Sequence, residues 1–117
     1  MKLPNGDKAL VPTAKIEGYA LNFKHEKGKH KARVFKAALD ITIENAAVLH
    51  AALHSAARNS DAQFEETTAF DDKYIIDFEM TTEKGSATVR SAWILDKGSD
   101  TPRLTSTFIK EMKKERP

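Results

Sequence analysis

Tyr74-Ile75-Ile76-Asp77-Phe78-Glu79-Met80 is the stretch that decides the fold class. Apolar side chains occupy every second position, starting at Tyr74, and two of the three positions between them are acidic. A two-residue period is typical of a β-strand with one face on a core and the other face open. The same period returns in residues 88–95 and 103–109, and more weakly in residues 62–70. Turn residues such as Gly85 and Pro102 separate these runs. The C-terminal half therefore predicts an antiparallel meander of about four strands.

Helical periodicity dominates the chain before residue 60. Helices are expected at about 13–21, 29–39 and 43–58, with a loop at 22–28 and a charged, helical or frayed tail after residue 109. The inward stripes are Ala32, Phe35 and Leu39 in the second helix, and Val48, Leu49, Ala52, Leu53 and Ala56 in the third. Helices followed by strands predict an α+β domain whose N-terminal helices pack on one face of the sheet.

Length and composition limit the class of protein. The 117 residues fit one domain that spans residues 1–117. The absence of cysteine excludes a disulfide scaffold, thiol catalysis and zinc bound by cysteine. Residues 1–7 lack the apolar core of a secretory signal, and no apolar run approaches the roughly 18 residues of a membrane span. We therefore expect a cytoplasmic protein without a membrane segment.

Charge is concentrated in residues 21–36. The whole chain has a formal net charge of only +2, but this stretch contains six basic residues and the single acid Glu26. The basic residues are Lys24, Lys27, Lys29, Lys31, Arg33 and Lys36. Such asymmetry predicts a localised anion-binding surface. Lysines in the first turn of a helix are disfavoured by the macrodipole, and a bound anion would relieve that conflict.

Two histidines, His25 and His30, lie inside this basic stretch. Histidine is the side chain whose ordinary pKa lies nearest neutrality. Together with Lys29 and Lys31 they predict a phosphate cradle with a general acid or base, to which Arg33 adds a further cation. The alternative is a basic helix face that is only solvated.

The last two predicted strands carry a second polar group. Arg90 and Arg103 are placed so that they can project from neighbouring strands toward one anion. The alternative is an ordinary polar sheet face, with Trp93 as a core anchor. The hypothesis is one concave patch whose catalytic residues are His25, Lys29, Lys31, Arg90, Arg103 and a hydroxyl among Thr105, Ser106 and Thr107, with substrate contacts from His30, Arg33, Ser91 and Trp93.

Metal binding is not expected. His50 and His54 have the i, i+4 spacing of a zinc pair, but no glutamate follows His50 and the spacing supplies no third ligand. The carboxylate pairs 65–66 and 71–72 are interpreted as a solvated loop. We therefore expect neither a metal nor another cofactor.

Several motifs along the full length resemble a bacterial family known as a domain of unknown function. The matching pieces include Gly28-Lys29-His30-Lys31-Ala32-Arg33-Val34-Phe35, Arg90-Ser91-Ala92-Trp93-Ile94 and Pro102-Arg103-Leu104-Thr105. That family is similar in layout to the nuclease toxins grouped with barnase, EndoU, colicin and RelE. The resemblance implies a metal-independent ribonuclease, the toxin of a toxin–antitoxin or related conflict system. Under it, His25 matches the helical-loop histidine, Lys29 or Lys31 the lysine, and Thr105 or Ser106 the last-strand hydroxyl.

The favoured interpretation is a domain that binds RNA and cleaves it without metal. A cognate antitoxin or immunity protein would then be a second partner. The alternative is a non-catalytic RNA- or protein-binding module, such as an antitoxin, an immunity-type partner or a plain anion-binding adaptor. A ribonuclease needs its histidine, lysine and arginines within about 3 Å of one phosphate position. Cations scattered over separate faces would favour the binding module.

Overall fold

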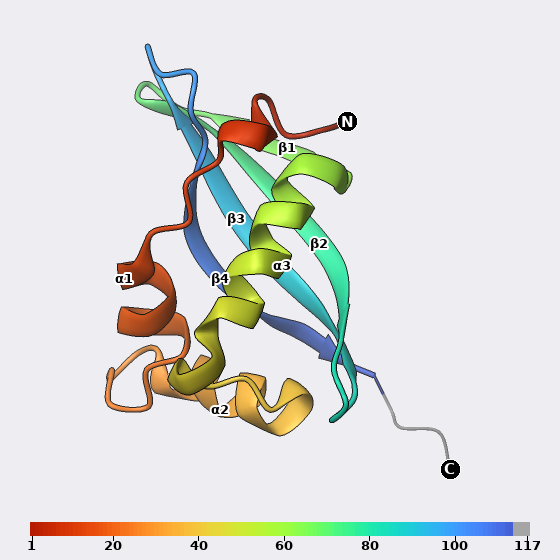
Figure 1. The fold of residues 1–117 in the computed structure, drawn as a ribbon. Helices are drawn as coiled ribbons and strands as arrows, with labels where there is room; N and C mark the ends of the chain where they lie inside the picture. The colour runs from red at the N-terminus through yellow and green to blue at the C-terminus, as the bar shows by residue number, and fades with distance from the viewer. Residues whose placement is uncertain (114–117) are drawn as a thin grey trace.

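The computed structural model describes residues 1–113, and its helices precede its strands as the sequence predicts. The α+β class is confirmed (Figure 1). The main helices are α1 (Thr13–Lys15), continued by a π turn at Ile16–Ala20, α2 (Lys29–Leu39) and α3 (Ala46–Asn59), which follows a single 3-10 turn. The strands are β1 (Gln63–Thr67), β2 (Asp71–Thr81), β3 (Ser86–Asp96) and β4 (Arg103–Met112).

The sheet is an antiparallel meander in the order β1-β2-β3-β4. Its central register places Tyr74 opposite Trp93 and Asp77 opposite Arg90. The predicted strand at 62–70 is shorter than expected, because Thr68 closes a turn by bonding the main chain of Phe70 and Asp71. The last strand is longer than predicted. It continues to residue 112 because β3 offers partners up to Ala87, so the expected tail begins later, and residues 114–117 lie outside the described part.

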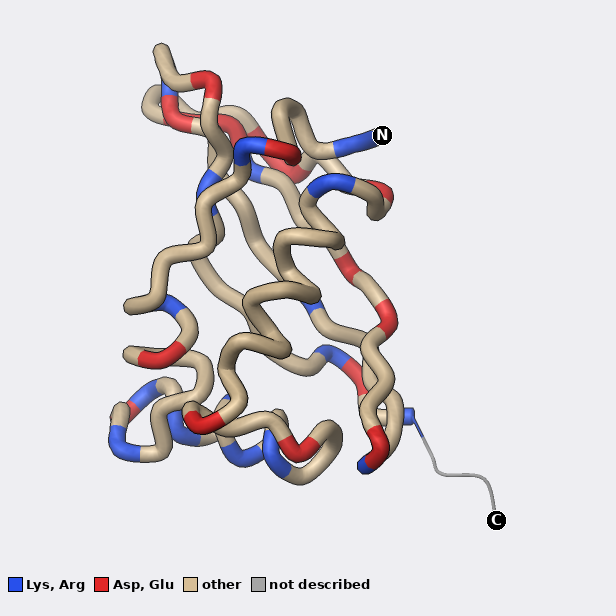
Figure 2. Tube along the Cα trace, in the orientation of Figure 1, with Lys and Arg blue, Asp and Glu red and all other residues tan. Residues whose placement is uncertain are grey.

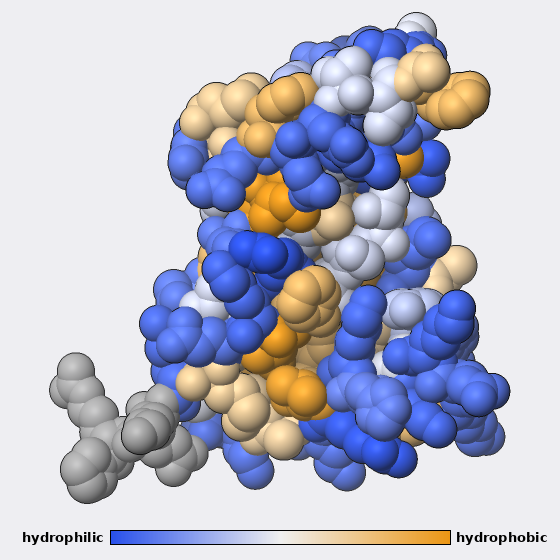
Figure 3. Space-filling model, turned by 180° about the vertical axis from the view of Figure 1, so that it is seen from behind, coloured by the Kyte–Doolittle hydropathy of each residue, from blue (hydrophilic) through white to orange (hydrophobic). Residues whose placement is uncertain are grey.

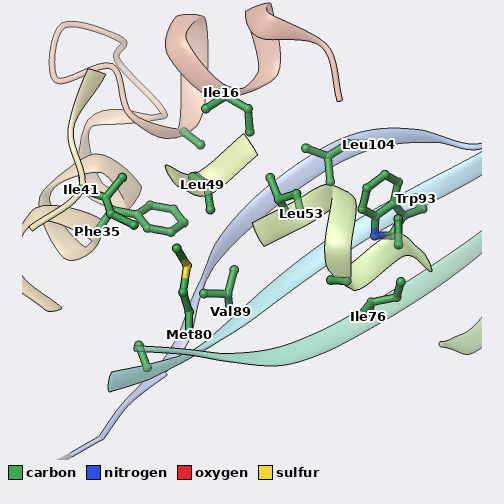
Figure 4. Close-up of a cluster of buried hydrophobic side chains, with 14 of the residues drawn as sticks. Ile16, Phe35, Ile41, Leu49, Leu53, Ile76, Met80, Val89, Trp93 and Leu104 are labelled. Carbon is green, nitrogen blue, oxygen red and sulfur yellow. The ribbon is translucent and has the colours of Figure 1, made fainter. Parts of the chain in front are cut away.

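All three helices lie on the same side of the sheet, with α3 across its middle and α2 at one end (Figure 1). Between them is a core of large side chains, which Figure 4 shows in close-up: Ile16, Phe35, Ile41, Leu49, Leu53, Ile76, Met80, Val89, Trp93 and Leu104. Full burial of one such side chain contributes about 1.5–3 kcal/mol. The predicted stripes are correct except for Val48, which is exposed because Ala46, Leu49 and Leu53 define the inward face of α3.

The opposite face of the sheet carries no helix among the described residues. Figure 3 views the molecule from that side, where hydrophobic patches alternate with hydrophilic side chains. The strand alternation places Ile75, Ala92 and Phe108 on this face, together with Asp77 and Arg90. No helix within residues 1–113 is long and apolar enough to cross a membrane.

The N-terminal segment ties distant parts of the chain together. Leu10 forms a parallel bridge to β4, in which its N–H donates to Pro102 and its carbonyl accepts from Leu104. Asn5 donates from its side-chain amide to the carbonyl of Asp100, a residue 95 positions later. Gly6 is needed because an added Cβ would lie 1.9 Å from the carbonyl oxygen of Ala57. This segment therefore closes one end of the sheet.

Candidate nucleic-acid interface

The loop at 22–28 is built around His25. Its ring nitrogen Nδ1 accepts hydrogen bonds from the main-chain N–H groups of Lys27 (3.1 Å) and Gly28 (3.0 Å). Its carbonyl accepts from the N–H of Lys29 at 2.9 Å, which starts α2. Because Nδ1 is an acceptor here, the neutral ring carries its proton on Nε2. His25 therefore shapes the loop and leaves Nε2 for a ligand.

The loop packs closely on the π turn. The His25 ring meets the Tyr19 ring edge-on, with centroids 4.5 Å apart. An added Cβ at Gly28 would lie 2.1 Å from the carbonyl oxygen of Tyr19. A side chain at this position would push the loop away from its support, so the position requires glycine.

Lys31 lies on the inner flank of α2. Its Nζ atom is 4.7 Å from the centroid of the Tyr19 ring and 5.5 Å from that of Phe108 in β4. Both contacts are cation–π interactions. Lys31 therefore joins α2 and the π turn to the sheet, whereas Lys29, Arg33 and Lys36 lie on another face of α2.

The remaining cations of this region form what we call the cationic arc: Lys24, Lys27, Lys29, Arg33 and Lys36. Lys29, Arg33 and Lys36 share the outer face of α2 at i, i+4, i+7 spacing, and exposed His30 lies beside them. Figure 2 shows the loop and α2 as the densest run of basic residues in the described chain. No carboxylate within residues 1–113 forms an ion pair with the arc.

The two predicted arginines have carboxylate partners on the sheet. Arg90 binds Asp77 through Nε (2.9 Å) and an Nη nitrogen (3.0 Å), and Lys110 reaches the same carboxylate at 3.2 Å. The hydrogen bonds from Arg90, helped by Lys110, hold the pKa of Asp77 below its ordinary value. Arg103 likewise binds Asp96 at 3.0 Å, and its hydrogen bond lowers the pKa of that carboxyl.

The arginines are also distant from each other along the sheet. Arg103 opens β4 at the end where Leu10 bridges, whereas α2 lies at the other end (Figure 1). Arg90 pairs across the strands with Phe108, whose ring contacts Lys31. The structure therefore places Arg90 nearer to the arc than Arg103, and holds each arginine in its own ion pair.

Most of the predicted hydroxyl groups bond to strand carbonyls. Thr105 donates to Ala92 (3.2 Å), and fully buried Thr107 donates to Arg90 (3.0 Å). Both bonds join β4 to β3 near irregularities in their pairing. Ser106 remains on the open face of the sheet, in register with Ala92.

Ser91 and Trp93, predicted as substrate contacts, are both fully buried. The indole N–H of Trp93 donates to the Ser91 hydroxyl at 2.9 Å, and this hydroxyl donates to the carbonyl of Ile76. The chain of hydrogen bonds satisfies the polar atoms of a core anchor. Their position agrees with the alternative interpretation of Trp93 as a core residue.

No group of three or more His, Asp or Glu side chains within residues 1–113 is arranged to hold a metal ion. His50 and His54 are half-buried on α3. In the acidic segment, Glu66 pairs with Lys73 and Asp72 with Lys97, so these carboxylates serve surface ion pairs.

The exposure of Phe23 and the hollow beside it were not predicted from the sequence. Phe23, in the basic loop, is 41% exposed and lines a hollow with Lys36, Asp40 and Glu44. The available signal was an aromatic residue inside a run of cations, a combination typical of single-stranded nucleic-acid binding. The acids were harder to find, because Asp40 and Glu44 come from the far end of α2 and the turn after it.

The fold and this surface define a small α+β domain with a cationic edge formed by one loop and one helix. The chain belongs to the family described as a domain of unknown function, DUF6883, which matches residues 2–111. Neither the curated proteins nor the solved structures include a significant match to the chain.

Proposed function

We propose that the domain binds RNA, or another phosphodiester chain, through the cationic arc. The observation that carries this proposal is the absence of ion pairs to the arc within residues 1–113, next to the paired cations of the sheet. Five cations held close together repel one another, and a polyanion relieves that repulsion. Phosphate contacts also release counterions, which drives binding at physiological salt.

The dimensions of the arc fit a short length of one strand. Lys29 and Lys36 are seven residues apart on α2, which corresponds to about 10 Å along the helix axis at 1.5 Å per residue. One nucleic-acid strand advances roughly 3.4 Å per nucleotide. The outer face of α2 therefore spans about three phosphates.

Fluorescence anisotropy with a labelled single-stranded RNA tests this proposal. The double variant Lys29→Ala/Arg33→Ala should bind more weakly, and its slope of log affinity against log salt should fall by about 0.7 for each lost contact. The matched control is Lys8→Ala/Lys97→Ala, which removes the same charge from two exposed lysines paired with Asp100 and Asp72. Equal losses in both variants would show that only net charge matters, and would reject the arc.

Metal-independent cleavage of RNA, as a toxin with a cognate antitoxin or immunity partner, is the second candidate function. The observation that favours it is the presence of two imidazoles, from His25 and His30, on the same basic surface. In the loop as folded, His25 offers an Nε2–H donor to a phosphate oxygen. Proton abstraction by this ring would require its Nδ1 bonds to Lys27 and Gly28 to break. His30, which is exposed, has no such requirement on the described surface.

Expression in a bacterial host, with total RNA incubated with purified protein in EDTA, tests cleavage. A ribonuclease should arrest growth and degrade RNA, and His30→Gln or His25→Asn should abolish both effects. His25→Asn is preferable to alanine because the asparagine oxygen can still accept the loop N–H groups. Intact RNA with undiminished RNA binding would leave the non-catalytic binding module as the function.

A further inference from the structure

Two adjoining hollows lie where the basic loop meets the C-terminal end of α2. The larger, of about 500 Å³, is lined by Phe23, Lys36, Asp40, Ile43 and Glu44, among others. The second, of about 430 Å³, shares Phe23, Lys36 and Asp40 with it and adds Arg33. Their size falls within the roughly 300–1,000 Å³ of small-molecule sites. The pair thus forms a continuous recess at the edge of the cationic arc.

Phe23 gives this recess a stacking surface. Phe23 is 41% exposed, and the Nζ atom of Lys36 lies 5.9 Å from the centroid of its ring. An aromatic ring beside a cation matches a nucleotide, whose base stacks on the ring while its phosphate meets the charge. The recess is continuous with the arc because Arg33 and Lys36 belong to both.

The recess also contains two carboxylates, Asp40 and Glu44, neither of which forms an ion pair within residues 1–113. A carboxylate repels phosphate and accepts hydrogen bonds without donating them. Its natural partner on a nucleotide is an amino group on the base, such as N4 of cytosine. Uracil has a carbonyl oxygen in place of that amino group.

The local backbone fixes where these carboxylates stand. Asp40 ends α2 in the left-handed region, at φ 55°. Asn45 then holds the turn, because its amide donates to the carbonyl of Asp40 and its oxygen accepts from the N–H of Thr42. Glu44 donates its own N–H to the Thr42 hydroxyl. Since the polar groups of Thr42 and Asn45 are used in this capping arrangement, the carboxylates are the acceptors left for a base.

We infer that this recess is a subsite for one unpaired nucleotide whose base carries an exocyclic amino group. Phe23 stacks on the base, Asp40 and Glu44 accept from its amino group, and Arg33 and Lys36 bind the adjacent phosphates. The inference rests on the proposed RNA binding and specifies it further. A base inside a duplex cannot reach Phe23, so the ligand is single-stranded, and cytidine is favoured over uridine.

Anisotropy titrations with labelled oligo(C), oligo(U) and a duplex of equal phosphate count test this subsite. Wild-type protein should bind oligo(C) about tenfold more tightly than oligo(U), within the range of one good amino-group contact. Phe23→Leu should weaken binding of oligo(C) by about tenfold, because the stacking of one base is lost, and should leave duplex binding unchanged. The control is Phe70→Leu, which removes the ring most exposed among the large described apolar side chains, at the β1–β2 turn, and should change nothing.

A second variant separates base recognition from simple charge. Asp40→Asn/Glu44→Gln removes two negative charges, so both pyrimidine oligomers should bind more tightly while the preference for oligo(C) falls to about twofold or less. Asparagine tolerates the left-handed backbone at position 40. A preference that persists in this variant, or an equal loss of affinity in Phe23→Leu and Phe70→Leu, would overturn the subsite.

The same titrations distinguish failure of the subsite from failure of the proposed function. If wild-type protein binds no RNA at low salt, both proposals fail. If the arc variant Lys29→Ala/Arg33→Ala loses affinity while oligo(C), oligo(U) and duplex bind wild type equally well, RNA binding stands and the subsite alone is rejected.

Discussion

The outer face of α2 and the open face of the sheet both carry lysine and arginine, but their charges are held differently. On the sheet, one carboxylate, Asp77, holds both Arg90 and Lys110, and Asp96 holds Arg103. On α2, Lys29 and its neighbours in the arc have no carboxylate partner among the described residues. A lysine or arginine is available to an external anion when no carboxylate of the fold is already paired with it.

The two faces also differ in how their charges are spaced along the chain. Arg90 and Asp77 are 13 residues apart and meet because a hairpin brings β2 and β3 into register. The cations of the arc are near neighbours in sequence, with Glu26 alone to oppose them up to Lys36. A high density of basic residues along the sequence therefore indicates the cations without a carboxylate partner. The cations that are paired with carboxylates are determined by which residues the strand register brings together.

Removing Trp93 is expected to give the largest effect on the sheet side. Trp93→Ala should lower the free energy of unfolding by about 3–5 kcal/mol, because it deletes a fully buried indole. Urea denaturation followed by circular dichroism measures the change. Phe23→Ala, on the α2 side, is the control and should cost far less. A stable Trp93→Ala protein that had lost RNA binding would instead place Trp93 on a binding surface.

Gly28 offers the next largest effect, on the side of the arc. Gly28→Ala should destabilise the protein by about 1–3 kcal/mol, because its Cβ would overlap the carbonyl of Tyr19. Gly18→Ala is the matched control, since the atom nearest to its added Cβ is Ala14 Cβ at 3.9 Å. Thermal denaturation gives the melting temperatures of both variants, and that of Gly28→Ala should be the lower. Equal melting temperatures would mean that the loop does not need its contact with the π turn.

Acid titration sharpens the contrast between paired and unpaired arginines. The lowered pKa of Asp77 contributes stability above the unfolded-state value of about 3.9, and that contribution is lost as the pH falls through the folded-state pKa. Arg90→Gln should therefore cost about 0.5–1 kcal/mol at pH 7 and should lose less further stability on acidification than wild type. Arg33→Gln should leave the fall in the free energy of unfolding at acid pH unchanged. If wild type and Arg90→Gln lost the same amount of stability between pH 7 and acid pH, the contribution of the Arg90–Asp77 pair would be contradicted.

The smallest expected effect is that of neutralising the arc itself. Lys29→Ala or Arg33→Ala should change the free energy of unfolding by less than about 0.5 kcal/mol. At low salt the change should be a slight stabilisation, because like charges are removed, and added salt should erase it by screening. Chemical denaturation at two salt concentrations measures the difference. A loss of several kcal/mol would reveal a structural role for these cations.

The class of fold was predictable because it depends on periodicity. Residues 74–80 alternate and residues 29–39 do not, so strands and helices could be separated before any contact was known. The exposure of Val48 and the extension of β4 to Met112 were not predicted, since both depend on what neighbouring elements cover or pair with. The π turn at 16–20 likewise has no local sequence signal that we recognise.

The candidate site was predictable only in its local part. The cationic arc follows from charge density along the chain, and its residues all lie in the loop at 22–28 and in α2 (Figure 2). The role of His25 as an acceptor for its own loop requires main-chain geometry, and the hydrogen bond of Thr107 to a β3 carbonyl requires strand register. Neither is readable from residue types, so Arg90, Arg103 and the strand hydroxyls could not be assigned by sequence alone.

The bridge between Leu10 and β4 also bears on the order of folding. Asn5 is synthesised 95 residues before its hydrogen-bond partner Asp100, and Leu10 precedes its partners Pro102 and Leu104 by a similar separation. Contacts so distant in sequence are slow to form, because a long loop must close before they contribute. During synthesis, Asn5 and Leu10 therefore remain without these partners until residues 100–104 have been made. Until then the main-chain groups of Leu10 lack their partners and are open to mispairing with another strand.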